Sequence, residues 1–403
     1  MKLLIFLKAL WFVIRQPRLA ARERLSDKGT RSDCDGVPVI TLRGSAYQRG
    51  FQHGDLLKAD LARFQQVAWA YAQQTASKRL GLPQWLATLL TRPMLLLISA
   101  TYLPAISASA RAEMQGLADA SGLPLREIVV QTVIWEVFAM LPGKPEHCSE
   151  FAFDGEHTQS GPLLGYNYDL IVAGDRTVVD TFLAIFVVEP DDGGAAYVAP
   201  NTIGSIGLNT AMNQHGVAFG WDNSYLNNHT SKGSSRTPYM LVLRDLALEA
   251  RTITDAATRL GQETRPEADI SVLADRQAVG VFECAGAQQA FRRNSRVWSC
   301  NRLQDLLELD YCGAGRPLDG RHERYPELMQ ATRPISPDAC IAILRDQGAP
   351  TGRQIASPNT AMAVLYDTIG QRLWVSLRGA PASHQPMLAF SASGERQPEA
   401  DIY

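Results

Sequence analysis

The chain has 403 residues, of which 46% are hydrophobic and 20% charged, and its formal net charge is −2. This ordinary globular composition excludes collagen-like, low-complexity and wholly disordered proteins, and the absence of a strong positive charge excludes a global basic field that recruits nucleic acid. The length allows one large domain or two to three small ones.

The first predicted element is an apolar and basic segment. Residues 3–14 (LLIFLKALWFVI) are apolar except Lys8, and six cations against Glu23 give residues 1–24 a net charge of +5. A secretory signal has an uninterrupted apolar core and a small-residue cleavage site. The pattern therefore favours a helix lying in a membrane interface, with an export signal or a helix packed on the body of the protein as the alternatives.

Helical periodicity dominates the next part of the chain. Apolar residues recur at helical spacing over residues 55–80 and 106–121, and residues 126–139 predict a third helix. The apolar run 94–106 is short and contains Pro104, so we expect a buried core helix there and not a membrane span.

From about residue 148 the periodicity becomes that of strands. The predicted strands are the runs SEFAFD, PLLGYNYD, TFLAIFVVE, VAFGWD, DISVLAD, AVGVFEC, AMAVLYD and RLWVSLR, separated by Gly, Asp or Asn turns. Helices at 238–250 and at 337–346, the latter with Ser336 as N-cap, interrupt the strands, and the polar run 225–236 predicts an exposed loop. Helical blocks beside many hairpin-linked strands indicate a layered α+β protein.

Several common catalytic signatures are missing from the sequence. It contains no GxSxG, HExxH, Walker A loop or GxGxxG, and its seven histidines lack metal-ligand spacing. Its six cysteines form no CxxC pair, which argues against a zinc knuckle or a thioredoxin motif. We expect most of them to be buried small apolar groups.

Cys148 is the exception, because it lies where the helical half ends and the strand-rich half begins. A cysteine that starts a strand becomes a nucleophile when the chain is cut just before it. Its own α-amine then lies beside its thiol and, with a pKa of about 7.7–8.0, acts as the base. Taken alone, a cysteine in this position is more often an inert core residue, by roughly four to one.

Blocks around Cys148 favour the nucleophile. They are LRGSAYQRGFQHG at 42–54, CSEFAF from Cys148, LLGYNYD with its Asn-Tyr-Asp, and IGLNTAMNQHGVAFGWDN. The weaker matches that follow are TPYMLVLRDLALEA, FECAG, WSCNRL and the closing hairpin AMAVLYDTIGQRLWVSLRGAP. In these blocks the sequence resembles N-terminal-nucleophile hydrolases of the acyl-coenzyme A:6-aminopenicillanic acid acyltransferase type, with acid ceramidase and bile salt hydrolase as more distant relatives. The resemblance implies a four-layer αββα sandwich, with two antiparallel sheets face to face and helices outside.

The resemblance also implies roles for single residues. Cys148 is the nucleophile, and Asp169 orients the liberated amine unless it is a turn residue at a strand end. Asn223 supplies its side-chain amide to the oxyanion hole unless the neighbouring Asp222 is the aligned position. Asn167 is expected to be a structural hydrogen-bonding residue.

Two positions depart from the family pattern. His147 precedes the nucleophile where the acyltransferase relatives have Gly, so it is expected to slow or assist cleavage. Tyr166 stands where relatives carry an Arg or Gln that contacts the amine or the substrate. A different substrate pocket is therefore expected, and penicillin chemistry is not inherited.

The expected protein is an autoprocessing cysteine amidohydrolase or acyltransferase. It moves the acyl group of an N-acyl, lipid-like amide through a thioester on Cys148 to water or an amine, with no metal, cofactor or nucleic acid. A phospholipase B-like ester hydrolase on the same scaffold, and a non-catalytic membrane-associated binding protein with an inert Cys148, are the alternatives.

The expected organisation is an anchor or signal-like segment at 1–30 and one hydrolase domain at 31–403. Within that domain a helical part, 31–147, and a strand-rich part, 148–403, stay associated after cleavage. The expected location is a membrane surface reached through the N-terminal segment, or outside the cytoplasm after export.

Overall fold

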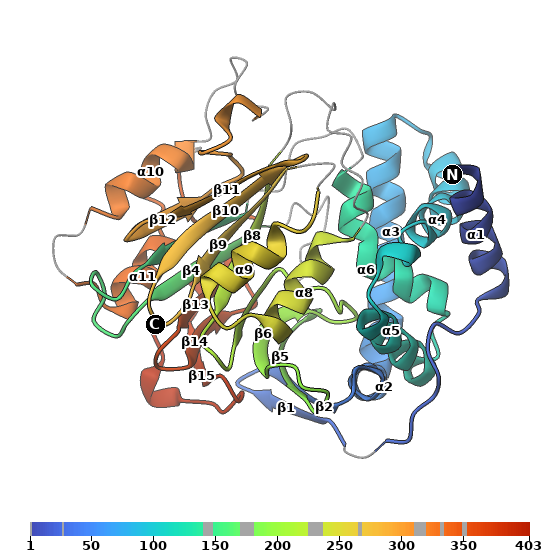
Figure 1. Cartoon of the computed structure of the whole chain (residues 1–403), viewed down its shortest axis with the longest axis horizontal. Coiled ribbons are helices and arrows are strands. Elements are labelled where there is room, and N and C mark those ends of the chain that lie inside the picture. The colour runs from blue at the N-terminus through green and yellow to red at the C-terminus, as the bar shows by residue number, and fades with distance from the viewer. Residues whose placement is uncertain are drawn as a thin grey trace.

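Two β-sheets form the centre of the molecule (Figure 1). The computed structural model describes residues 2–25, 28–139, 148–169, 181–224, 237–264, 268–309, 320–330, 334–348 and 353–403. In spatial order, the nine-stranded sheet contains β1 (Thr30–Cys34), β2 (Val37–Gly44), β5 (Leu183–Pro190), β6 (Tyr197–Thr202), β7 (Thr210–Asn213), β8 (Ala218–Ser224), β9 (Ala268–Ala274), β10 (Val279–Ala285) and β11 (Gln288–Arg293). The six-stranded sheet contains β12 (Arg296–Ser299), β3 (Ser149–Phe153), β4 (Leu163–Asp169), β13 (Thr360–Asp367), β14 (Arg372–Ser376) and β15 (Leu388–Ser391).

The two sheets pack face to face. Ile185 of β5 and Val272 of β9, from the larger sheet, share one buried cluster with Leu164 of β4 and Val364 of β13, from the smaller one. Successive residues of a strand point to opposite faces, so the residues between them face outward. Phe186 of β5, for example, belongs to a second cluster that the helices cover.

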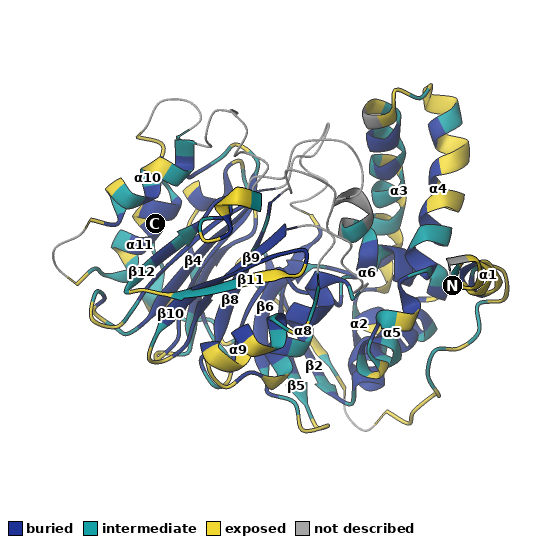
Figure 2. Ribbon diagram, turned by 45° about the horizontal axis from the view of Figure 1, so that its top comes forward, coloured by how far each residue is buried: buried dark blue, intermediate teal, exposed yellow. Residues whose placement is uncertain are grey.

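Helices cover both outer faces of this sandwich (Figure 2). On the larger sheet's side lie α1 (Lys2–Arg15), α2 (Ala46–Leu56), α3 (Lys58–Leu80), α4 (Gln84–Ala100), α5 (Ala108–Ser121), α6 (Leu125–Ala139), α8 (Tyr239–Glu249) and α9 (Ile253–Leu260). On the smaller sheet lie α10 (Gly320–Leu328) and α11 (Pro337–Leu344). The fold is the predicted four-layer αββα sandwich.

One strand pair corrects the expectation of purely antiparallel sheets. β2 and β5 run parallel, whereas the other strand pairs of the described chain are antiparallel. The helices α2 to α6 and the strands β3 and β4 lie between β2 and β5 in the sequence. No hairpin therefore joins the two strands, and the long crossover permits a parallel pairing.

The eight predicted strand runs are present as β3, β4, β5, β8, β9, β10, β13 and β14. Four predicted helices are present as α5, α6, α8 and α11, and the side chain of Ser336 caps α11 by accepting from the Ala339 N–H at 3.3 Å. The predicted helix at 55–80 is wrong at its start. α2 begins at Ala46 because Ser45 and Gln48 form a capping box, and α3 follows after Leu57.

The expectation of helices before strands is wrong for residues 30–44, which form the hairpin β1–β2. The strands β6, β7, β11, β12 and β15 and the helices α9 and α10 also escaped prediction. The run 225–236 lies outside the described residues.

The apolar run 94–106 is mostly buried, as expected: Leu95, Leu96, Leu103 and Ile106 are each less than 10% exposed, and Met94 is 47% exposed. Residues 94–100 form the end of α4, whose earlier residue Leu89 is 63% exposed. Residues Gln84–Ala105 are long and apolar enough to cross a membrane by length and composition alone, with 44% of that window buried inside the protein. At the N-terminus, α1 packs through Ala9 and Phe12, with Ile5 and Val13 half-buried, and exposes its remaining apolar residues.

Candidate active site

Strand direction brings the predicted site residues to one end of the sandwich. β3 begins next to Cys148, β4 ends at Asp169, and their antiparallel register pairs Ser149 with Asn167. Cys148 therefore lies level with the last residues of β4. β8 ends at the same edge, so it carries Asp222 and Asn223 to this end of the larger sheet.

Cys148 is buried, with 7% of its surface exposed. Its Sγ lies 3.6 Å from the hydroxyl of Tyr166 and 3.9 Å from the carbonyl oxygen of Asp169. Burial raises the pKa of the thiol well above its ordinary value, and the negative charges of Asp222 and Asp169 raise it further. The thiol of the uncut chain is therefore neutral at pH 7, and attack requires a base that removes its proton.

Asp169 is fully buried and held on both carboxylate oxygens. Its Oδ1 accepts a hydrogen bond from Thr360 at 2.6 Å, and its Oδ2 lies 3.7 Å from the guanidinium of Arg321. Thr360 pairs with Asp169 across β13 and β4, so the sheet itself fixes this contact. Because the carbonyl oxygen of Asp169 lies 3.9 Å from the Cys148 thiol, this buried carboxylate is close enough to that residue to interact with a nearby ammonium group.

Asp222 and Asn223 differ in what surrounds them. Asp222 is 1% exposed and accepts hydrogen bonds from the hydroxyl of Ser299 and from the backbone and side-chain amides of Asn301. Asn223 is partly exposed, and its Oδ1 lies 3.4 Å from the amide of Asn301. Asp222 is fixed by its neighbours, whereas the donor end of the Asn223 amide is the one able to turn toward a substrate.

Two further residues complete the site, and sequence reasoning missed both. Arg321, at the start of α10, is 4% exposed and lies 3.3 Å from the carbonyl oxygen of Cys148 and 3.0 Å from Oδ1 of Asn301. Asn301 connects this arginine to Asp222 and adopts a left-handed backbone with φ of 56°. The run WSCNRL contained the only sequence signal for Asn301, and nothing in the motif analysis marked Arg321.

Tyr166 and Asn167 point to opposite faces of β4. The hydroxyl of Tyr166 lies beside the thiol and also 3.1 Å from the carbonyl oxygen of Trp221, which accepts its hydrogen bond. The side chain of Asn167 instead donates to the carbonyl oxygen of Leu344 at the end of α11, at 3.0 Å. Asn167 thus ties the sheet to its helical cover, away from the thiol. His147 lies outside the described residues.

A third carboxyl group lies behind the thiol. Glu150 is fully buried between the sheets, where its Oε1 accepts from the backbone N–H of Val272 at 3.2 Å. Burial raises its pKa well above the ordinary value, and the charge of Asp222 adds to this effect. Both effects favour the neutral form of Glu150, whereas Asp169 and Asp222 lie near Cys148 together with the cation of Arg321.

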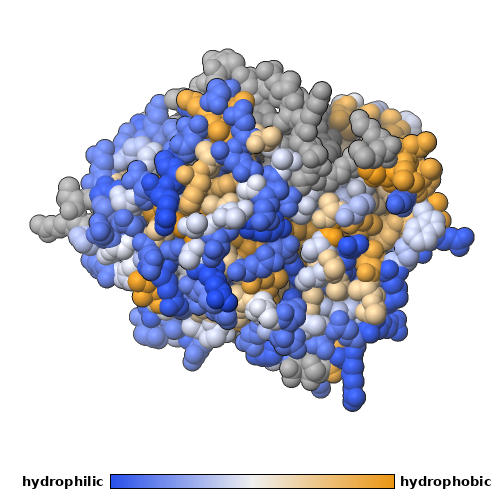
Figure 3. All heavy atoms as spheres, viewed as in Figure 1, coloured by the Kyte–Doolittle hydropathy of each residue, from blue (hydrophilic) through white to orange (hydrophobic). Residues whose placement is uncertain are grey.

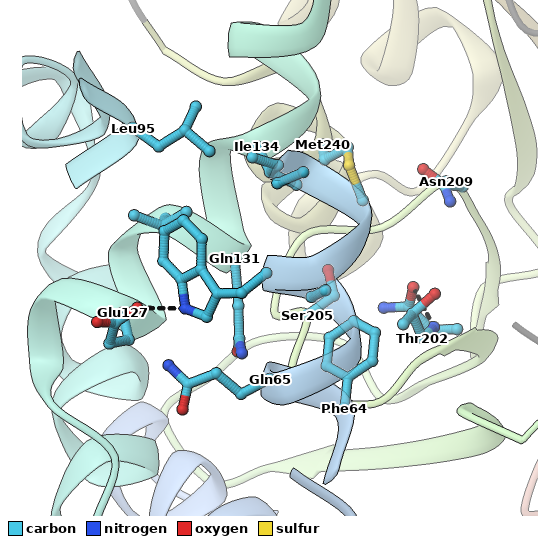
Figure 4. Close-up of a pocket in the computed structure, with 15 residues that line it drawn as sticks. Phe64, Gln65, Leu95, Glu127, Gln131, Ile134, Thr202, Ser205, Asn209 and Met240 are labelled. Atoms are coloured by element: carbon cyan, nitrogen blue, oxygen red, sulfur yellow. Dashed lines mark hydrogen bonds between the residues drawn. The ribbon is translucent and has the colours of Figure 1, made fainter. Parts of the chain in front are cut away.

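A pocket that opens to solvent lies on the helical side of the larger sheet, with about 670 Å³ of space including its open mouth (Figure 4). Its apolar lining comes from α3, α4, α6 and α8 and includes Phe64, Leu95, Ile134 and Met240. Its polar lining comes mainly from α6 and the β6–β7 connection. Within the described chain, the buried side-chain amide atoms of Gln131 and the Oδ1 of Asn209 have no hydrogen-bond partner.

Comparison with protein families gives one match. The model of the acyl-coenzyme A:6-aminopenicillanic acid acyl-transferase family matches residues 157–380, which is more than half of the chain. The chain belongs to this family. The match covers Tyr166, Asp169, Asn223 and Arg321, and it begins nine residues after Cys148.

Solved structures of low identity are also similar to the chain. An N-acylethanolamine-hydrolyzing acid amidase ortholog of Caenorhabditis elegans is 12% identical, over 55% of this chain and 93% of that one, with a TM-score of 0.40. Penicillin V acylase of Agrobacterium tumefaciens is 12% identical over 57% and 82%, with a TM-score of 0.34. A mutant conjugated bile acid hydrolase of Clostridium perfringens is 11% identical over 57% and 89%, with a TM-score of 0.39. No curated protein sequence matches the chain.

Family membership confirms the resemblance in the sequence to N-terminal-nucleophile hydrolases and acyltransferases that act on amides. The fold and the family together identify the chain as an enzyme of carbon–nitrogen bond chemistry. The nucleophile, its activation and the substrate need separate arguments.

Proposed function

We propose that the protein is an autoprocessing cysteine amidohydrolase or acyltransferase with Cys148 as its nucleophile. The observation that carries the proposal is the position of the Cys148 thiol. It belongs to the residue just before β3 and lies beside the end of β4 that carries Asp169, and the carbonyl oxygen of the same residue accepts from the buried guanidinium of Arg321. A core cysteine does not require buried charges around it, and Cys340, in an apolar cluster, illustrates that case.

Cleavage before Cys148 supplies the missing base. In this first step the thiol proton passes to the Cys148 nitrogen: the Sγ attacks the carbonyl carbon of residue 147, and the C–N bond breaks as that nitrogen takes up the proton and becomes an amine. Water then hydrolyses the thioester, which leaves a carboxyl group on residue 147 and a free thiol on Cys148. The new amine lies on the nucleophile itself, so the two groups need no further orientation.

The same groups carry the reaction with substrate. The amine takes the thiol proton, and the thiolate attacks the carbonyl of an N-acyl amide. The amine then returns the proton to the leaving nitrogen, and a thioester remains on Cys148. Water or an acceptor amine releases the acyl group. Asp169 orients the ammonium form of the base, and Asn223 donates to the developing oxyanion.

The cavity between α3, α6 and the β6–β7 connection supports an apolar acyl group. It lies at the end of the larger sheet where β8 delivers Asn223, and β6 is only two strands, about 10 Å, from β8. In this proposal a lipid-like chain that starts at the thioester extends around this end of the sheet toward Ile134 and Met240. The polar atoms of Gln131 and Asn209 suit a polar group farther along such a chain.

Intact mass and N-terminal sequencing of the purified protein test the cleavage. We expect two associated fragments, with the second beginning at Cys148. Cys148→Ala should remain one inactive chain, and Cys148→Ser should process slowly, since a hydroxyl is the poorer nucleophile. Cys340→Ala, at a buried cysteine distant from these charges, is the matched control and should be cut normally. Fully active wild-type enzyme that remains uncut would overturn the mechanism.

Paired substrates test the reaction class and the acyl site. An amide and an ester of the same acyl chain separate an amidase from a phospholipase B-like ester hydrolase. Ile134→Trp fills part of the cavity, so we expect kcat/KM to fall about tenfold for a palmitoyl amide and little for a hexanoyl amide. Equal losses for both chains would exclude the cavity as the acyl site without touching the role of Cys148.

A further inference from the structure

The exposed apolar residues of the protein are concentrated on two helices. Of the sixteen large apolar side chains that are exposed in the described chain, eleven lie on α1 and α4. They are Leu3, Leu4, Phe6, Leu7, Leu10, Trp11 and Ile14 on α1, and Trp85, Leu89, Leu90 and Met94 on α4. We call this surface the α1–α4 face. Soluble monomers rarely leave so many apolar side chains together on one surface.

On α1 the exposed apolar residues occupy one side of the helix. At 3.6 residues per turn, the seven positions fall within an arc of about 160°. Ala9 and Phe12 lie on the opposite side, where they pack into the core. Lys8 and Arg15, both exposed, fall just outside one edge of the apolar arc. An apolar face bordered by cations is the pattern of a helix that lies in a lipid interface.

On α4 the exposed residues extend the same surface. Trp85, Leu89 and Met94 are exposed on the first part of the helix, and Leu96 and Ala100 farther along are buried in the cluster that includes Phe12 of α1. α1 therefore covers the end of α4 and continues its apolar side outward. Figure 2 shows exposed residues along the outer sides of both helices, and Figure 3 shows hydrophobic residues gathered there.

The charges beside this face complement an anionic surface. Arg18 is held by Asp119 at 2.8 Å, and Arg22 lies 3.7 Å from the same carboxylate. These two pairs fix the segment that follows α1 against α5. Lys8 and Arg15 on α1 stay exposed beside the apolar arc.

We propose that the α1–α4 face docks the protein on a lipid bilayer that contains anionic lipid. The apolar side chains enter the boundary between headgroups and acyl chains, and Trp11 and Trp85 lie at the headgroup level. Lys8 and Arg15 contact the phosphates. A protein partner or a second copy of the chain would not require cations along the border of an apolar surface. The proposal concerns binding alone, so it stands apart from the chemistry at Cys148.

Vesicle flotation of the full chain tests the proposal. Wild type should float with vesicles of phosphatidylcholine and phosphatidylglycerol, and more weakly with phosphatidylcholine alone. The combined change Trp85→Gln, Leu89→Gln and Met94→Gln should lower the partition coefficient at least about tenfold. Lys8→Glu with Arg15→Glu should weaken binding several-fold on the anionic vesicles only, and high salt should imitate that change.

Exposed apolar residues outside the α1–α4 face provide matched controls. Ile369→Gln and Leu307→Gln change exposed apolar residues outside the α1–α4 face and should leave flotation unchanged. Equal thermal stability of all variants shows that folding is intact. Wild type that fails to float, or an α4 variant that floats like wild type, overturns the proposal. A wild-type dimer that this variant converts to monomer, without vesicle binding, would instead make the face an interface between copies.

Discussion

The site around Cys148 and the α1–α4 face depart from ordinary burial in opposite directions. The strand-rich part buries charge, with Asp169, Asp222 and Arg321 each less than 5% exposed. The helical part exposes apolar surface, with Leu3, Trp85 and Leu89 each more than 60% exposed. Burying a charge costs free energy unless it is paired, and exposing apolar surface forgoes the main stabilising term of folding.

The comparison separates two ways in which a fold carries function. Buried charges around a thiol serve chemistry, because they act in a low-dielectric setting and are held in place before the substrate arrives. Exposed leucines and tryptophans serve contact, because their surface is withdrawn from water only when a partner covers it. Variants at each region therefore should fail differently, the first in catalysis and stability together, the second in binding alone.

The largest effect is expected from removing the buried cation. Arg321→Ala leaves Asp169 and Asn301 without the guanidinium, so we expect the free energy of unfolding to fall by about 3–5 kcal/mol and activity to be lost. Arg321→Lys keeps the positive charge but loses the planar guanidinium with its several N–H donors, and should recover part of the stability. Arg324→Ala, on the same helix, breaks a more exposed pair with Asp346 and should cost about 1 kcal/mol. Chemical denaturation measures all three, and equal losses at both arginines would remove the special role of Arg321.

The second prediction separates Asn223 from its neighbour. Asn223→Ala should lower kcat about 100–1000-fold with little change in thermal stability, since its side chain is partly exposed and acts on the transition state. Asp222→Ala should affect kcat less and stability more, because Ser299 and Asn301 then lose their acceptor. The reverse result would move the oxyanion donor by one residue.

Sequence reasoning found the parts of this site that a local motif carries. Cys148, Asp169 and Asn223 each stand in a run with its own pattern, and eight strands could be predicted from period-two patterns and turns. Arg321 could not, because it reaches the carbonyl oxygen of Cys148 only through the packing of α10 on the smaller sheet, and a short helix contains no sign of what it covers. Asn301 escaped for the same reason, since its neighbours Asp222 and Arg321 are distant in sequence.

The helical part shows where patterning misleads. The run 94–106 is mostly buried as predicted, but the exposed Trp85, Leu89 and Leu90 earlier on α4 were not predicted, because apolar content alone does not say which side of a helix is covered. The start of α2 at Ala46 depends on the capping box of Ser45, and it lies nine residues before the predicted helix start at residue 55. The predicted interfacial role of residues 1–24 stays a prediction, now with α4 as its second element.

The helical part also buries a titratable group, His53, whose effect on stability can be measured. His53 of α2 is 1% exposed, and its Nε2 accepts the Gly204 N–H at 3.0 Å. Burial lowers its pKa to about 4, and the charge of Glu113 only partly offsets that effect. Between pH 6.5 and about 4 the unfolded chain therefore binds a proton that the folded chain does not. The free energy of unfolding should decrease by about 3 kcal/mol as the pH is lowered across this window.

His53→Gln keeps an acceptor for Gly204 and removes the titration. The denaturation midpoint of this variant should change less between pH 7 and pH 4.5 than that of wild type, by roughly the amount that the shifted pKa implies. His384→Gln, at an exposed histidine, should follow the wild-type profile. A variant at position 53 with the wild-type pH dependence would show that other groups set the acid sensitivity.

The smallest effect is expected on the exposed side of α4, where one helix offers a matched pair. Leu89 is 63% exposed and Leu95 is 6% exposed. Leu89→Ala removes no packed contact and places a better helix former, so the free energy of unfolding should change by less than about 0.5 kcal/mol. Leu95→Ala should cost about 2 kcal/mol, at the lower end for a buried leucine because its side chain already borders the cavity. Chemical denaturation of both variants in the absence of lipid measures the difference. A cost at Leu89 equal to that at Leu95 would mean that a protein surface already covers this side of α4 in solution, which removes the basis for a free apolar face.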